Sequence, residues 1–158
     1  MQLTTLLESV NITLSAPALT PQCLQASKAY LFLLSSPSSN SSSSHREKII
    51  GCVIAQRIST AMAIAPREES TSSSKDSSAL RLVPTPLPTP LGIPRLFVSS
   101  AHRRLGVAST LLTAAAETFI LGCPLDPKKG EVAFTQPTGL GGMVLENWAG
   151  GRGRVYEE

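Results

Sequence analysis

Apolar residues form short runs in the first part of the chain, and polar residues separate these runs. KAYLFLL, Lys28 to Leu34, has the length and the aromatic and aliphatic content of a buried strand. IIGCVIAQRI, Ile49 to Ile58, predicts a second strand that pairs with the first as an antiparallel hairpin. A third, short strand is predicted within STAMAIAP, residues 59–66. These runs predict the beginning of a β-sheet.

Two polar stretches interrupt this pattern. Residues 35–48 contain no apolar residue, so we expect a solvated loop there. Residues 67–90 are first polar and then rich in proline, which predicts a disordered insertion that the fold can do without. The chain has 158 residues, so we expect residues 1–158 to form a single domain that carries these two loops.

The second part of the chain alternates between strands and helices. Gly92 to Ser99 predicts a strand, and a helix that ends near Gly122 follows it. EVAF, Glu131 to Phe134, predicts another strand, and the GLGG that comes soon after it is expected to be a turn. A helical MVLENWAG, residues 143–150, and a closing strand from Arg154 to Tyr156 complete the pattern. The order of elements indicates a mixed α/β sheet with one prominent central helix. The apolar residues of that helix fall on one side: Val107, Leu111, Leu112, Ala115 and Phe119.

Composition narrows the possible functions. The net charge of +3 is mild and argues neither for nor against a polyanionic partner. We do not expect direct nucleic-acid binding as a primary role. The three cysteines are far apart and the two histidines have no partner at ligand spacing, so we expect no metal site. Apolar stretches stay far below the roughly twenty residues that span a bilayer, so we expect no membrane partner.

SSAHRRLG, residues 99–106, joins the predicted strand to the predicted central helix. The first amides of a helix lack intrahelical partners and lie at the positive end of its dipole, so a diphosphate can accept from several of them. Gly106 has no Cβ to hold the oxygens away, Ala108 keeps the first turn narrow, and Arg103 or Arg104 can add charge-assisted contacts. A solvated basic turn before an ordinary helix explains these residues equally well. The glycine patterns of Walker and Rossmann loops are absent.

This strand, loop and helix resemble the acetyl-coenzyme A motif of the GNAT acetyltransferase superfamily. That motif has Gln or Arg, then Gly three positions later, then Gly or Ala two positions after that. The resemblance implies acetyl-CoA as cofactor and a GNAT-like, mostly antiparallel sheet with a central pyrophosphate-binding helix. It implies that Leu96, Phe97 and Val98 line the pantetheine arm. The diphosphate would lie against one continuous segment: Arg103, Arg104, Leu105, Gly106, Val107, Ala108 and Ser109.

A narrower resemblance covers nearly the whole chain apart from the two polar stretches. GIPRLFV, RRLGVASTLL, EVAFTQPTG and RVYEE follow one another as in the acetyltransferase domain of the sister-chromatid cohesion establishment family, in its filamentous-fungal form. The family implies transfer of acetyl from acetyl-CoA to lysines of a cohesin ATPase-head subunit, in the nucleus, during DNA replication. Replication-fork proteins are a further class of partner that it implies.

The chain departs from that family in two ways. Family members usually carry a C2H2 zinc finger before this domain, and the finger's cysteines and histidines are missing here, so we expect a version or fragment without it. Animal members place a serine and an aspartate near the acceptor lysine, where this chain has Pro94 and Gln136. Neither side chain can take a proton at neutral pH, so the general base is left unassigned. Gln136 is therefore the candidate catalytic residue only as a group that orients the lysine or a water.

Other residues complete the expected acceptor cleft. Thr135, Pro137 and Thr138 are expected to bind the acceptor beside Gln136. Glu131 is the nearest carboxylate in sequence, although an exposed residue at a strand end is the more ordinary interpretation. His102 is expected to be solvated or close to the phosphates, and Trp148 to belong to the core. A catalytically silent GNAT-like binding module and a small-molecule N-acetyltransferase remain as alternatives.

Overall fold

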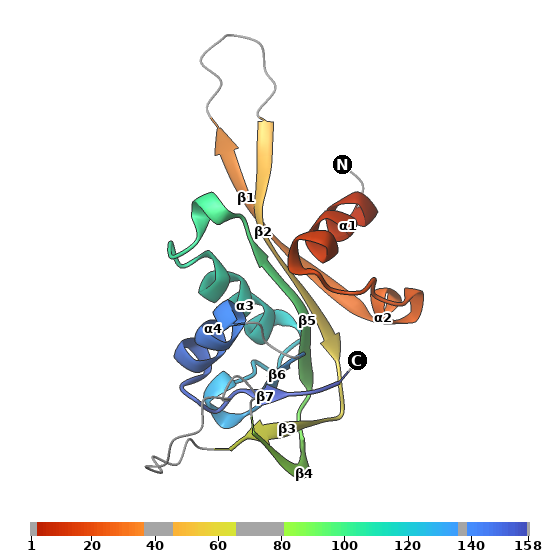
Figure 1. Ribbon diagram of the computed structural model, residues 1–158, viewed down its shortest axis with the longest axis vertical. Helices are drawn as coiled ribbons and strands as arrows, with labels where there is room; N and C mark the ends of the chain where they lie inside the picture. Colours follow the sequence, from red (N-terminus) through yellow and green to blue (C-terminus); the bar gives the residue numbers. More distant parts are fainter. Residues whose placement is uncertain (1–2, 37–45, 66–80, 136–138, 158) are drawn as a thin grey trace, which may run out of the picture. The chain divides into compact units, whose positions relative to one another are not determined.

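The computed structural model describes residues 3–36, 46–65, 81–135 and 139–157 (Figure 1). The chain divides into two compact units. One unit consists of Met1–Gln56 and Ile93–Pro124, and the other of Arg57–Gly92 and Leu125–Glu158. The expectation that residues 1–158 form a single domain stays a prediction.

Two helices, a strand hairpin and a strand–helix segment form the first unit. In chain order its elements are α1 (Leu3–Leu14), α2 (Pro21–Gln25), β1 (Ser27–Ser36), β2 (Arg46–Arg57), β5 (Leu91–Val98), the short 3-10 helix η1 (Ser100–His102) and α3 (Val107–Thr118). The last residue of β2 and the first two of β5, Leu91 and Gly92, are counted with the other unit. The strands lie in the order β1-β2-β5, and β1 and β2 are antiparallel as the sequence predicted. Figure 1 shows α1 and α2 on one side of these strands and α3 on the other.

Short strands and one longer helix form the second unit. Its elements are β3 (Thr60–Ile64), β4 (Leu82–Pro88), the short 3-10 helix η2 (Pro127–Lys129), β6 (Val132–Phe134), α4 (Gly139–Ala149) and β7 (Arg154–Val155). The strands lie in the order β6-β7-β3-β4. β3 is antiparallel to both β4 and β7, whereas β6 and β7 are parallel. Both units are mixtures of helices with mostly antiparallel strands, which confirms the predicted α/β class.

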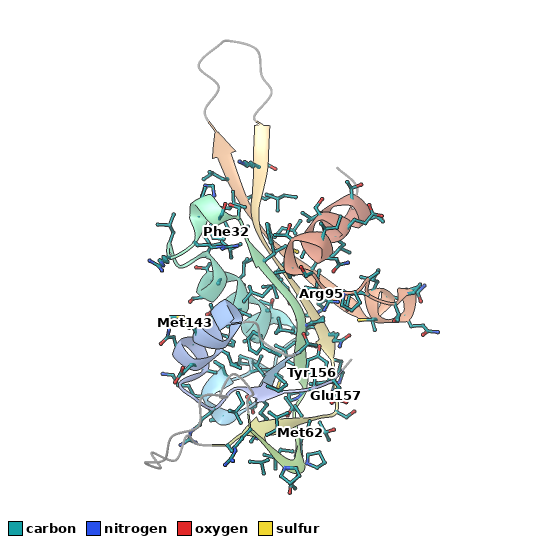
Figure 2. All side chains as sticks on the ribbon, in the orientation of Figure 1. Phe32, Met62, Arg95, Met143, Tyr156 and Glu157 are labelled. Atoms are coloured by element: carbon teal, nitrogen blue, oxygen red, sulfur yellow. The ribbon has the colours of Figure 1, made fainter. Side chains whose placement is uncertain are left out.

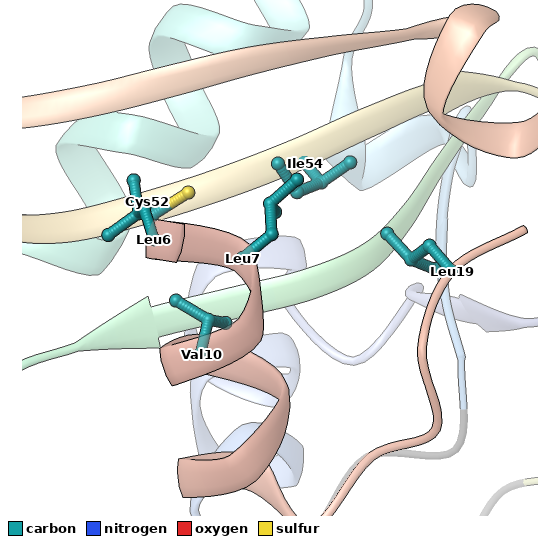
Figure 3. Packing of buried hydrophobic residues seen from close by; sticks show 6 residues of the cluster. All are labelled: Leu6, Leu7, Val10, Leu19, Cys52 and Ile54. Atoms are coloured by element: carbon teal, nitrogen blue, oxygen red, sulfur yellow. The ribbon is translucent and has the colours of Figure 1, made fainter. Parts of the chain in front are cut away.

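The amino-terminal helices are elements that the sequence analysis did not predict. Leu6, Leu7 and Val10 of α1 are buried against Cys52 and Ile54 of β2 (Figure 3). Apolar residues at positions 3, 6, 7, 10 and 14 have the spacing of one helix face, so the signal was present. Because α1 buries this face on β2, it is part of the core of its unit.

The prediction that Lys28 to Leu34 is a buried strand was wrong about burial. The strand exists and runs from Ser27 to Ser36, but Leu31, Leu33 and Leu34 are 39%, 46% and 43% exposed. The reason is its place at the end of the strand order, where β2 is its one hydrogen-bonded neighbour among the described strands. The two strands also extend into both ends of the expected loop at 35–48, and the rest of that loop lies outside the described residues.

The expected insertion at 67–90 also contains a strand. β4 pairs antiparallel with β3, and Met62 faces Pro86 across the pair. Proline lacks a backbone N–H and is tolerated in a strand at the end of a sheet, which is where β4 lies in its unit. Thr89, directly after β4, is only 1% exposed, so this part of the stretch belongs to the fold. Residues 66–80 lie outside the described residues.

The predicted helices differ from the observed ones at their ends. All five apolar residues predicted on one side of the central helix are buried, which confirms that face. α3 ends at Thr118, and Gly122 lies in the following turn with a φ of +72°. α4 begins at Gly139, so GLGG starts this helix and is not a turn. Strands β3, β5, β6 and β7 lie where the sequence predicted them, within one or two residues.

Candidate functional site

β5 and α3 are joined by a bend whose last residue is Gly106. Gly106 is the N-cap of α3, with φ +79° and ψ −1°. Because glycine has no side chain, no cap hydrogen bond is made to the first amides of the helix. Apart from Gly106 itself and its two chain neighbours, no described atom lies within 4 Å of the place where a Cβ of this residue would be. The first amides of α3 therefore lack a side-chain cap, and the residue before them has room on its Cβ side, an arrangement that suits an anionic ligand.

Two arginines precede this glycine. Arg103 and Arg104 are exposed, and Arg104 has a positive φ of 63°. The Nε of Arg103 donates a long hydrogen bond of 3.4 Å to the carbonyl oxygen of Val98. Leu105 is 70% exposed. The bend thus places two exposed cationic side chains within a few residues of the uncapped first amides of α3.

The bend is held to the sheet by Ser99 and His102. The Ser99 amide donates to the carbonyl oxygen of Ile50 on β2 at 2.8 Å. The Ser99 hydroxyl and the Nδ1 of His102 form a hydrogen bond of 2.7 Å. His102 is half-buried, so it holds the loop in shape, a structural role that the sequence analysis did not assign to it.

Gly51 lets the first turns of α3 approach β2 closely. A Cβ at Gly51 would lie 2.8 Å from Cγ1 of Val107 and 2.9 Å from Cδ1 of Leu111. Both distances are too short for a real contact, so only glycine fits without a shift of α3. The sequence analysis missed this residue, although a glycine inside a strand pattern is a known sign of close approach.

The last three residues of β5 do not share one environment. Leu96, Phe97 and Val98 are half-buried, and the side chain of Phe97 packs against the cluster formed by α1 and β2. Because side chains alternate along a strand, Leu96 and Val98 point to the opposite face, toward α3. Their contact with a pantetheine arm stays a prediction, with Phe97 contributing backbone only.

Arg95 is a buried cation that the sequence analysis did not single out (Figure 2). Its Nε donates to Oδ1 of Asn11 at 3.0 Å, and its Nη2 donates to the carbonyl oxygen of Pro17 at 2.7 Å. Its Nη1 donates to the carbonyl oxygen of the buried Pro94 at 2.6 Å. These bonds tie α1 and the segment after it to the strand that leads to the bend.

The residues expected at the acceptor belong to the second unit. Thr135 follows β6 and is half-buried, whereas Gln136, Pro137 and Thr138 lie outside the described residues. An Oε2 atom of Glu131 accepts a hydrogen bond of 2.6 Å from the amide of Asp126, so this carboxylate stabilises a turn. Trp148 makes an edge contact with Phe134, with ring centroids 6.5 Å apart, which agrees with the expected core role.

The described residues show neither a metal-binding cluster nor a membrane-spanning helix. They contain no group of three His, Cys, Asp or Glu side chains that could hold a metal ion. No helix within them is long and apolar enough to cross a membrane.

Comparison with known proteins matches part of this chain to a family of acetyltransferases. Residues 88–156 match the family model described as ESCO1/2 acetyl-transferase. The N-acetyltransferase ECO1 of Yarrowia lipolytica is 36% identical over 112 residues, which cover 71% of this chain and 36% of that protein. The N-acetyltransferase eso1 of Schizosaccharomyces pombe is 36% identical over 104 residues, which cover 65% of this chain and 12% of that protein. The chain thus spans about a third or less of the length of these relatives.

Solved structures show the same similarity in three dimensions. The xEco2 acetyltransferase domain bound to a CoA conjugate matches with a TM-score of 0.78 and 26% sequence identity. The match covers 98% of this chain and 82% of that one. A second structure of the xEco2 acetyltransferase domain matches with a TM-score of 0.73.

The fold and the glycine-capped bend therefore define an acetyltransferase domain of the GNAT type. Within that class, the chain is similar to the ESCO1/2 acetyltransferases, whose family model matches residues 88–156.

Proposed function

We propose that this chain transfers the acetyl group of acetyl-CoA to a lysine side chain of a protein. The observation that carries the proposal is the bend at Gly106, open and uncapped at the start of α3, within a segment that matches the ESCO1/2 family. The matched xEco2 domain has a CoA conjugate bound, which supports the same cofactor here.

The residues present fit the diphosphate of acetyl-CoA. The backbone amides of Val107, Ala108 and Ser109 have no side-chain cap competing for them, and Gly106 places no Cβ before the helix. Arg103 and Arg104 supply two positive charges that would neutralise the phosphates. Leu96 and Val98 on β5 would offer apolar surface to the pantetheine arm.

When bound, acetyl-CoA supplies an activated thioester. The task left to the protein is to bind the acceptor amine while the amine loses a proton, because a lysine near pKa 10 must be neutral to attack. The attack would form the amide bond and break the thioester bond, and coenzyme A would leave as its thiol after taking up a proton. Glu131 already holds the Asp126 amide, which favours a structural role for this carboxylate. The proposal therefore assigns the proton to solvent water, with Gln136 and Thr135 orienting the amine or that water.

The acceptor that we propose is a cohesin ATPase-head subunit in the nucleus, modified during DNA replication to establish sister-chromatid cohesion. Replication-fork proteins would be partners in that setting. The support is the likeness to ECO1, eso1 and xEco2, whose acetyltransferase domains share this fold or sequence.

The test is transfer of a labelled acetyl group from acetyl-CoA to purified cohesin head fragments, followed by mass spectrometry of the modified lysine. We expect one or a few head lysines to carry the label. Binding of head fragments without any label would favour the silent binding module, which the engagement of Glu131 also favours. Label on small amines alone would favour a small-molecule N-acetyltransferase.

A further inference from the structure

A shallow basic depression lies in the second unit. Its volume is about 250 Å³, and Lys129, Arg152 and Arg154 contribute its charged side chains. The other described residues that line it are uncharged: Ala63, Ile64, Leu87, Gly130, Gly151 and Gly153. We call this surface the basic depression.

One of its three cations is fixed in place. The Nη1 of Arg154 donates to the carbonyl oxygen of Pro88 at 2.6 Å and to the hydroxyl of Thr89 at 2.8 Å. Gly130 makes room for the guanidinium, because a Cβ there would lie 2.7 Å from the Nε of Arg154. The Arg154 head group is therefore held in position by the end of β4.

The other two cations are unpaired among the described residues. Lys129 and Arg152 are exposed, and neither makes an ion pair or side-chain hydrogen bond with a described residue. The carboxylates nearest to Lys129 in sequence, those of Asp126 and Glu131, accept from backbone amides of their own turn. Three positive charges thus face one depression with no described carboxylate lining it, which favours an anionic partner.

The chemistry of the lining distinguishes between kinds of anion. Backbone amides commonly bind phosphate, but three of those in the lining are already used: the amides of Gly130, Gly151 and Arg152 donate to the carbonyl oxygens of Pro127, Glu146 and Ala149. The groups that remain to bind a ligand are the cationic side chains, which lie in the same lining as the apolar Ile64 and Leu87. Aspartate and glutamate side chains match this lining, because their carboxylates can pair with the cations and their apolar stems can contact Ile64 and Leu87.

We propose that the basic depression binds an acidic peptide segment of the protein acceptor. This inference rests on the proposed function and deepens it, since it names how an acceptor protein is recognised away from its reacting lysine. A cationic lysine would itself be repelled by the depression, so the segment bound there is a flanking one.

The test is binding of a fluorescent hexaglutamate peptide to the full chain at low salt, measured by anisotropy, with hexaglutamine as the reference peptide. The double variant Lys129→Glu, Arg152→Glu is expected to weaken hexaglutamate binding by about tenfold or more. The matched control, Lys48→Glu with Arg57→Glu, changes two exposed cations outside the depression. Both pairs change the net charge from +3 to −1, since each substitution subtracts two charges. We expect the control pair to keep binding within about twofold.

Three results would overturn the inference. They are absence of hexaglutamate binding, equal loss in both double variants, and complete displacement of the peptide by millimolar inorganic phosphate. The last result would assign the depression to phosphate. The shift in melting temperature caused by acetyl-CoA is read on the same proteins, so a failure of the cofactor site is recognised separately from a failure of peptide binding.

Discussion

Gly106 and Gly51 shape the start of α3 in different ways. Gly106 has a left-handed φ of +79° and open space around it, so it needs glycine for its backbone and for access. Gly51 needs glycine because Val107 and Leu111 lie where its Cβ would be. The first residue opens the bend to a ligand, and the second fixes where the helix amides stand.

Gly106→Glu should abolish the rise in melting temperature that acetyl-CoA produces. The new carboxylate would occupy the place of a phosphate and repel it, while the positive φ costs roughly 1–2 kcal/mol of stability. Gly122→Glu is the matched control, because Gly122 also has a positive φ of 72° and open space but lies after α3. The control should show the same modest destabilisation and a normal response to acetyl-CoA. An equal loss of response in both variants would contradict the role of Gly106.

Gly51→Val should lower stability by about 1–3 kcal/mol and also weaken acetyl-CoA binding, because Val107 and Leu111 must move. Gly92→Val is the matched control, since its Cβ would lie 2.8 Å from Ile58 and 2.8 Å from Tyr156, in the second unit. Chemical denaturation measures the first effect and calorimetry with acetyl-CoA the second. If Gly92→Val weakens cofactor binding as much as Gly51→Val does, α3 is not positioned through Gly51.

Cys52 makes stability depend on pH. Burial under α1 raises the pKa of its thiol from 9.0 to about 11. Since the folded pKa is higher than the unfolded one, this contribution is complete below pH 9 and is lost as the pH rises toward 11. Its size is about 2–3 kcal/mol for two pKa units.

The free energy of unfolding, measured between pH 8 and 11, should therefore fall more steeply in the native chain than in Cys52→Ala. At pH 8 a thiol reagent should modify the exposed Cys123 and leave Cys52 unmodified in the folded protein. Identical pH slopes with and without Cys52 would show that its thiol does not titrate as described.

At the scale of elements, β4 shows where composition misleads. Pro84, Pro86 and Pro88 made the stretch look incapable of regular structure, but a strand at the end of a sheet can accept prolines. β1 shows the opposite error, because its apolar content predicted burial that a strand with one neighbour does not have. In both cases the missing information was the order of the strands, which depends on contacts between distant parts of the chain.

Strands β3 and β4 hold together the two residues that flank 66–80, Ala65 and Arg81. The amide of Ala65 donates to the carbonyl oxygen of Arg81 at 2.8 Å, so a two-residue turn can connect these strands. Replacement of residues 66–80 by Asn-Gly should leave the melting temperature within about 5 °C of the native value. Replacement that extends through residue 88 removes β4 and should unfold the second unit, as followed by circular dichroism. Equal stability of the two shortened chains would contradict the place of β4 in the fold.

At the scale of the whole molecule, local signals were predictable and long-range ones were not. The strand, bend and helix around Gly106 are continuous in sequence, so the pattern of residues 92–119 placed them correctly. Arg95 with Asn11 and Gly51 with Val107 are pairs separated by many residues, and no single-sequence pattern indicates such partners. The basic depression likewise combines Ala63, Leu87, Lys129 and Arg152 from distant segments.

The most direct test of the central claim is a nitrogen–proton NMR spectrum of the chain recorded with and without coenzyme A. If the bend holds the linked phosphates, the amide signals of residues 104–109 should shift most, followed by those of residues 96–98. Unchanged signals from Gly106 to Ser109 at saturating coenzyme A, in a protein whose spectrum is that of a folded chain, would contradict it.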